Sequence, residues 1–171
     1  MNVRQIEQII LNNTYTKSDF LKRLTIIREY LEAKFFTDSQ LSFSDFLDKL
    51  KVSLYEREAL IRFDDSFFGL FTKDNLYQLI KGLTENLKSL PLLTLYTPVM
   101  LDDLQLDELG KWFRQNLNPE LIMDIRINPL LVSGCAYVWK GKYKDLSLHF
   151  FLSRKQAIIS KIIESFVHEN L

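Results

Sequence analysis

The sequence has one cysteine, only five glycines and four prolines, and no long apolar run. A single cysteine cannot form an intramolecular disulfide, which favours a reducing compartment. No apolar run approaches the roughly 18 residues of a membrane span, and the first residues lack the apolar core of a signal peptide. We therefore expect a cytosolic protein made mainly of regular elements with short connections.

The sequence also lacks net charge, since its 22 basic residues equal its 22 acidic residues. Each half is neutral, with 13 residues of each sign in 1–90 and 9 of each in 91–171. A neutral chain lacks the basic excess of most nucleic-acid-binding proteins. Charges in the second half are nevertheless sorted, with acids at 102–108 and bases at 140–144 and 154–161. This arrangement favours protein partners that bind through apolar grooves and local charge patches.

Apolar residues are abundant, at 47% of the chain, and they follow helical spacing throughout the first half. The stripes predict helices over 3–10, 20–31, 43–50, 55–63 and 76–87. Thr16, which begins a capping-box-like Thr16–Asp19 segment, and Thr72 are predicted N-caps. Because the connections are short, we predict an N-terminal antiparallel helical bundle over residues 1–89.

The pattern changes at Pro91, after which short apolar runs alternate with helical segments. We predict strands over 92–97, 121–127 and 135–139, a tight turn at 140–142 and a return strand from Tyr143. A helix is expected from Asp102 or Asp103 to Leu117, and a long final helix from 148 to 166. The predicted fold class is α+β, with a small mixed α/β C-terminal domain over residues 90–171.

Residues with catalytic chemistry are few, and none forms a recognisable site. His149 and His168 would lie about 28 Å apart on one helix, too far to share a metal ion. Cys135 has no evident base and is interpreted as a small buried residue. The acids at 102–108 fit the first turns of a helix, where they favour its dipole. No phosphate-binding glycine motif occurs. We therefore expect that the protein is not an enzyme and that it binds no cofactor or metal. The alternative is a small enzyme with a site at Cys135 or at the acids 102–108.

One segment favours a different function. Aromatic and basic residues alternate around the predicted hairpin: Tyr137, Trp139, Lys140, Lys142, Tyr143 and Lys144. Stacking platforms for single-stranded nucleic acid combine rings and cations in this way. The alternative hypothesis is therefore a single-stranded RNA-binding adaptor, although lysines also protect hairpin edges against aggregation.

Residues 128–152 read NPLLVSGCAYVWKGKYKDLSLHFFL. This segment resembles the C-terminal signature of the delta subunit of F-type ATP synthases, the family of the mitochondrial oligomycin-sensitivity-conferring protein. The matching positions are Pro129, Gly134, Asp145, Ser147 and Leu152, while Ser133 and Leu146 stand where the family has glycine. The predicted order, a helical bundle followed by strand, helix, strands and helix, also resembles the family.

The resemblance implies structural tasks for these residues. Gly134 would allow a close backbone approach, and Asp145 or Ser147 would cap the last helix.

The resemblance also implies a non-catalytic peripheral-stalk subunit on the cytoplasmic side of the bacterial plasma membrane, peripheral to the membrane through the complex. The helical domain would bind the N-termini of the alpha subunits, the C-terminal domain would bind the b subunits, and no nucleic acid is expected. Candidate partner-binding residues are Ile6, Ile10, Leu76, Ile80, Ile162 and Phe166.

Overall fold

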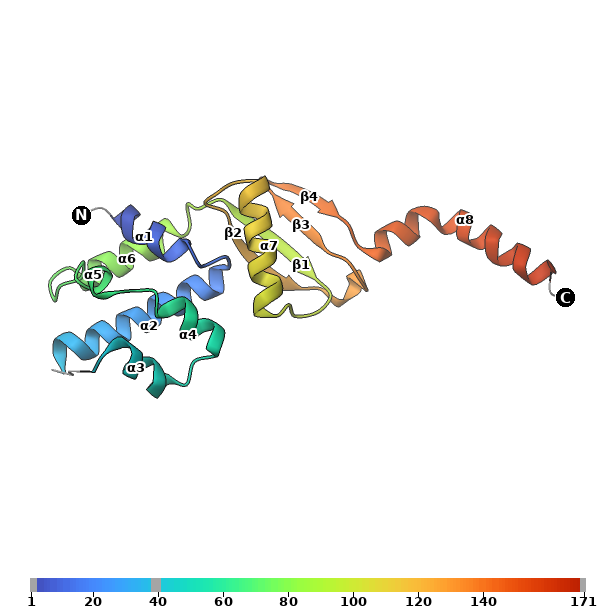
Figure 1. Cartoon of the computed structure of the whole chain (residues 1–171). Coiled ribbons are helices and arrows are strands. Elements are labelled where there is room, and N and C mark those ends of the chain that lie inside the picture. Colours follow the sequence, from blue (N-terminus) through green and yellow to red (C-terminus); the bar gives the residue numbers. More distant parts are fainter. Residues whose placement is uncertain (1–2, 38–40, 170–171) are drawn as a thin grey trace. The chain divides into compact units, whose positions relative to one another are not determined.

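The computed structural model describes residues 3–37 and 41–169, apart from the side chains of residues 157 and 166–169. The chain combines helices with a four-stranded mixed sheet (Figure 1), which confirms the predicted combination of helices and strands. It divides into two compact units. The first comprises Met1–Pro91 with Asp103–Ile122, and the second comprises Leu92–Asp102 with Met123–Leu171.

The elements that lie wholly within the described residues of the first unit are helices. Its elements are α1 (Val3–Leu11), α2 (Lys17–Phe36), α3 (Phe43–Leu50), α4 (Leu54–Leu60), α5 (Asp65–Phe68), α6 (Leu76–Asn86) and α7 (Asp103–Asn116).

Side-chain caps fix where four of these helices begin. The side chains of Thr16, Ser42, Ser53 and Asp64 each accept a hydrogen bond from the backbone amide three residues later. The predicted cap at Thr16 is therefore confirmed. At Thr72 the predicted hydrogen bond to the Asn75 amide forms and the Asn75 side chain bonds back, but the regular helix α6 begins at Leu76, so its N-cap residue is Asn75 and not the predicted Thr72.

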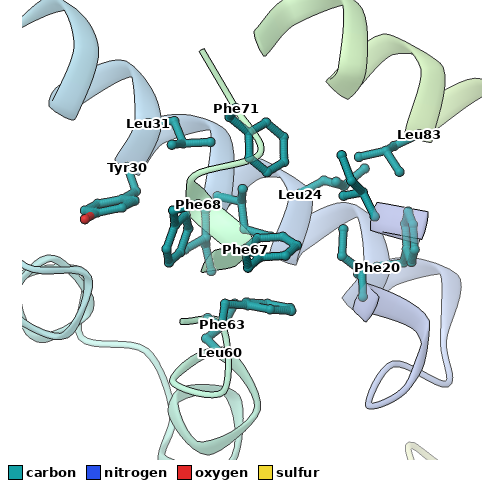
Figure 2. Packing of buried hydrophobic residues seen from close by; sticks show 14 of the residues in the cluster. Phe20, Leu24, Tyr30, Leu31, Leu60, Phe63, Phe67, Phe68, Phe71 and Leu83 are labelled. Carbon is teal, nitrogen blue, oxygen red and sulfur yellow. The ribbon is translucent and has the colours of Figure 1, made fainter. Parts of the chain in front are cut away.

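Aromatic rings fill much of the core of the first unit. Figure 2 shows Phe63, Phe67, Phe68 and Phe71 gathered near α2, which supplies Tyr30. The Phe63 and Phe67 rings stack with centroids 4.4 Å apart, and the Phe68 ring meets Tyr30 edge-on at 4.9 Å. Such pairs add about 0.5–1.5 kcal/mol each beyond the burial of their area. The four-residue helix α5 is thereby anchored in spite of its length.

The same unit contains a buried ion pair. Arg23 of α2 donates from Nε to a carboxylate oxygen of Glu56 of α4 at 3.0 Å, and both side chains are almost completely buried. Arg23 Nη1 also donates to the Asn13 carbonyl at 2.5 Å and to Thr14 Oγ1 at 2.8 Å. The guanidinium group therefore joins α2, α4 and the loop after α1.

Helix α7 packs within the first unit through Arg114. Its guanidinium donates to the carbonyls of Leu11 and Thr14, each at 2.6 Å, and lies 4.6 Å from the ring of Tyr15. Gly110 leaves room for the same ring, since an added Cβ would collide with it. The predicted boundary at 89/90 put residues 103–122 in the second domain, whereas the structure groups them with the first unit.

The second unit holds the sheet and the last helix. Its elements are β1 (Leu92–Thr97), β2 (Ile122–Ile127), the 3₁₀ turn η1 (Pro129–Leu131), β3 (Ala136–Trp139), β4 (Lys142–Asp145) and α8 (Leu148–Glu169). The strand order is β2-β1-β3-β4, and β3 pairs antiparallel with both of its neighbours. Lys140 and Gly141 connect β3 to β4 with φ values of 49° and 75°. This confirms the predicted tight turn, a two-residue hairpin loop with positive φ at both positions.

Candidate interaction surface

Gly134 lies where two segments of the second unit come closest. Its φ is +82°, and an added Cβ would lie 2.5 Å from the carbonyl oxygen of Leu146. The Leu146 amide donates to the Cys135 carbonyl, and the Leu148 amide donates to the Ser133 carbonyl, both at 2.9 Å. Glycine is therefore required here for its conformation and for its lack of a side chain.

Asp145 and Ser147 fix the start of α8. Ser147 Oγ accepts from the Phe150 amide at 3.1 Å, so of the two predicted caps, Asp145 and Ser147, it is Ser147 that caps α8. Asp145 accepts from the Ser147 amide at 2.8 Å, and hydrogen bonds from the side chain and amide of Ser147 lower the pKa of the Asp145 carboxyl. These two residues connect the end of β4 to α8.

The turn before Gly134 exposes two apolar side chains. Asn128 caps η1 by accepting from the Leu130 amide, and Pro129 occupies the first position of the turn. Val132 follows with φ 64° and ψ −54°, and the Ser133 amide donates to the Leu131 carbonyl at 2.7 Å. This is a γ-turn of the strained kind that is rare for a β-branched residue. It leaves Val132 67% exposed and Leu130 80% exposed.

Helix α8 presents an apolar stripe that the described residues of its own unit leave exposed. From Phe151 to Ser165, every described side chain is exposed except Ile159, which is half-buried. The large exposed apolar residues are Leu148, Phe151, Leu152, Ile158, Ile162 and Ile163. They lie on one side of the helix because positions three, four, seven and eleven residues apart, such as 148 and 152, 151 and 158, and 152 and 163, share one face. We call this stripe the α8 face; it includes the predicted residues Leu152 and Ile162, while the Phe166 side chain lies outside the described residues.

Positive charge lies on the α8 face, at Lys155, and beside it, at Arg154 and Lys161. Arg154, Lys155 and Lys161 are exposed on the helix, and Glu164 is the acid among the described side chains. The Arg154 guanidinium lies 5.4 Å from the ring of Phe150. A partner with an apolar stripe and acidic flanks would complement this surface.

In the first unit, most of the predicted interface residues belong to the core. Ile6, Ile10 and Leu76 are fully buried, and Ile80 is half-buried against the same core. The helical spacing of these four residues therefore reflects packing into the core of the unit and not a surface for a partner. Ile6, Ile10 and Leu76 therefore cannot contact a partner in this structure.

The neighbouring Ile9 is exposed and lines a groove of about 850 Å³ with the side chains of α1 and of the α5 region. Phe67 and Leu70 add apolar lining, and Arg4 and Arg62 add positive charge. We call this the Ile9 groove. The sequence analysis missed it, although Ile9 lies to one side of the Ile6–Ile10 stripe.

The hairpin tip carries exposed basic and aromatic groups. Tyr143 is exposed and its hydroxyl donates to Asp145 at 3.3 Å. The Lys140 amine lies 5.6 Å from the centre of the Trp139 ring and covers part of the face that a base would stack on.

Two of the candidate catalytic groups, Cys135 and the acids at 102–108, lie within the described residues. Burial and the Asp145 charge raise the pKa of the Cys135 thiol, which opposes formation of a nucleophilic thiolate. Asp107 forms an ion pair with Lys111 at 2.5 Å on the surface of α7. Within the described part of the chain, no group of three or more His, Cys, Asp or Glu residues could hold a metal ion. The His168 side chain lies outside the described residues.

Glu7 of α1 is a buried acid on a small polar pocket of the first unit. Burial and the charge of Glu120 raise its pKa, while the amide of Asn86 and the charge of Arg4 partly offset this. The folded state therefore holds the Glu7 proton more tightly than the unfolded state.

We expect the stabilisation from Glu7 protonation to be complete below about pH 4.5, the ordinary pKa. It should be lost as the pH rises through the raised pKa. The gain in unfolding free energy from Glu7→Gln should therefore increase between pH 4.5 and pH 7 in urea titrations. The exposed Glu29→Gln variant is the control, and a Glu7→Gln effect that is independent of pH would contradict the expectation.

No protein-family model matches the chain, and no curated protein sequence matches it. None of the described helices is both long and apolar enough to cross a membrane.

Proposed function

We propose that the protein is a non-catalytic stator subunit of a rotary proton-translocating F-type ATP synthase. In this role it joins the catalytic alpha/beta head to the membrane-anchored b subunits on the cytoplasmic side of the bacterial plasma membrane. Its task is to hold the head against rotation while the rotor turns. Such a task requires tight association with partners and no chemistry of its own.

The exposed α8 face is the observation that carries this proposal. A 22-residue helix with large apolar side chains exposed along one side has little reason to exist in isolation. Exposed apolar surfaces of this kind mark sites of protein association, and an amphipathic helix docks through anchors spaced by three and four residues. We assign the α8 face to the b subunits.

The residues of the family resemblance support the same proposal. Gly134, Asp145 and Ser147 jointly set where α8 begins and how it leaves the sheet. A helix that transmits force needs such a rigid base. In the first unit, we propose that the helices form the antiparallel bundle of the family and that the Ile9 groove receives an N-terminal segment of an alpha subunit.

The test is binding to purified b and alpha subunits. We expect Ile162→Asp to weaken binding to b at least tenfold, because one buried isoleucine is worth about 1.5–3 kcal/mol and about 1.4 kcal/mol is a factor of ten. The matched control is Ser160→Asp, which places the same charge on the other side of α8. Since both positions are exposed, neither change should lower the unfolding temperature.

If neither alpha nor b binds the wild-type protein, the stator proposal is wrong. The second candidate function, a single-stranded RNA-binding adaptor, is favoured by the exposed Tyr143 and by the three lysines of the hairpin tip. Binding of single-stranded RNA that weakens with salt and is lost when Lys140, Lys142 and Lys144 become alanine would support it instead.

A further inference from the structure

Lys155 of α8 is a charged residue on the apolar side of its helix. Phe151 and Leu152 lie about one turn before it and Ile158 lies about one turn after it, so all four residues share the α8 face. Each of these side chains is exposed. The helix therefore places one cation in the middle of the surface that we assign to a partner.

The chain supplies no counter-charge to Lys155. Ion pairs along a helix join residues three or four positions apart. Around Lys155 these positions are all apolar: Phe151, Leu152, Ile158 and Ile159. Among the residues that the structure describes, no carboxylate lies within 4.0 Å of the Lys155 amine. The ammonium group is thus left to solvent until a partner covers the face.

A partner that covers the α8 face removes water from the Lys155 ammonium group. The stem of the lysine can lie along the apolar stripe while its amine reaches towards the edge, but a charge that is desolvated without a counter-charge is costly. A carboxylate on the partner offsets this cost by forming a charge-assisted hydrogen bond. In coiled coils, a single polar residue in the apolar seam specifies partner and register in the same way.

A second copy of α8 does not supply this carboxylate. Glu164 is the acid among the described side chains of the helix. It follows Lys155 by nine residues, which is about two and a half turns, so it lies on the side of the helix opposite the α8 face. Two α8 faces placed together would leave both lysines without a counter-charge. The helix that covers the α8 face therefore belongs to a different protein.

We propose that Lys155 selects the partner of the α8 face, which is an amphipathic helix with a carboxylate within its apolar stripe. The positive charge of Arg154, Lys155 and Lys161 against the single charge of Glu164 favours an acidic partner over a basic one. This inference rests on the proposed function, because it states which chemistry the b subunits must present to α8. An aspartate or glutamate of b lies opposite Lys155, with apolar residues three and four positions to either side.

The first test is titration calorimetry of the full-length protein with purified b. Lys155→Met keeps a long side chain and removes the charge, so we expect it to weaken binding at least tenfold by leaving the carboxylate of b unpaired. Lys155→Glu brings two like charges together and should weaken binding further. The matched control is Lys161→Met, which lies about a third of a turn from Lys155 around α8 and should bind b as the wild type does. Since both lysines are exposed, none of these changes should lower the unfolding temperature.

The second test is a charge reversal in b. Each aspartate or glutamate in the b segment that the complex protects from hydrogen exchange is changed to lysine in turn. One of these b variants should restore binding to Lys155→Glu and weaken binding to the wild type, because the pair is formed again with its signs exchanged. A lysine that served only solubility would give no such rescue.

The results that overturn this inference differ from those that overturn the stator proposal. If the wild type binds b and Lys155→Met binds it as tightly, or if no reversal in b rescues Lys155→Glu, the inference is wrong and the stator proposal stands. If the wild type does not bind b, both are wrong. Sedimentation of the wild type with phosphatidylserine vesicles, or as a dimer, would then show that a membrane surface or a second copy covers the α8 face.

Discussion

Replacing Glu56 by glutamine should lower the free energy of unfolding by about 3–5 kcal/mol, the usual cost of removing one partner of a buried ion pair. The substitution leaves the Arg23 guanidinium charged and almost completely buried without a counter-charge. Its remaining partners, the Asn13 carbonyl and Thr14 Oγ1, are neutral. They accept hydrogen bonds from the guanidinium, but they carry no negative charge to offset the free-energy cost of removing its positive charge from water.

Urea unfolding followed by circular dichroism measures this effect. The control is Asp48→Asn, which breaks the more exposed pair with Arg57 and should cost no more than about 1 kcal/mol. In the double variant Arg23→Met/Glu56→Leu both charges are absent, so we expect it to be more stable than Glu56→Gln. If Glu56→Gln costs as little as Asp48→Asn, the pair is not buried in solution as it is in the structure.

The ion pair shows one limit of prediction from the sequence. Arg23 follows Phe20 by three residues and precedes Ile27 by four, so it falls on the apolar side of α2. A charged residue in that position signals a buried partner. The partner itself, 33 residues away on another helix, depends on tertiary packing that no local pattern contains.

Local features were predictable because local chemistry determines them. The Thr16 cap, the Ser147 cap and the turn at Lys140–Gly141 each depend on a few adjacent residues. Thr72 is the exception. Its hydroxyl makes the expected bond to the amide three residues later and the Asn75 side chain bonds back, as in a capping box, but residues 73–75 form a turn and α6 begins only at Leu76.

Periodicity could not separate core residues from surface residues. Ile6 and Ile10 have the same spacing as Ile158 and Ile162, yet the first two are fully buried and the last two are exposed. The spacing shows only that a helix has an apolar side. What covers that side is decided by neighbouring elements, which is why the sequence predicted Ile6 and Ile162 alike as partner-binding residues and only the structure separates them.

Gly134→Ala should destabilise the second unit by about 3 kcal/mol. Part of the cost is the φ of +82°, which any residue with a Cβ adopts with strain of roughly 1–2 kcal/mol. The rest is overpacking, about 1–3 kcal/mol, because the new methyl group would lie 2.5 Å from the Leu146 carbonyl oxygen and 3.1 Å from the Ser147 Cα. Both are backbone atoms, so no flexible side chain can move aside.

Gly141→Ala separates these two contributions. Gly141 has a similar φ of +75°, but nothing lies within 4 Å of an added Cβ. It should therefore cost only the conformational strain, and the difference between the variants measures the close approach at Gly134. Amide hydrogen exchange at Tyr137 and Lys144, which pair across β3 and β4, would locate the loss in the second unit. Equal costs for the two variants would mean that the backbone at Leu146 and Ser147 yields easily, and Gly134 would then not fix the position at which α8 begins.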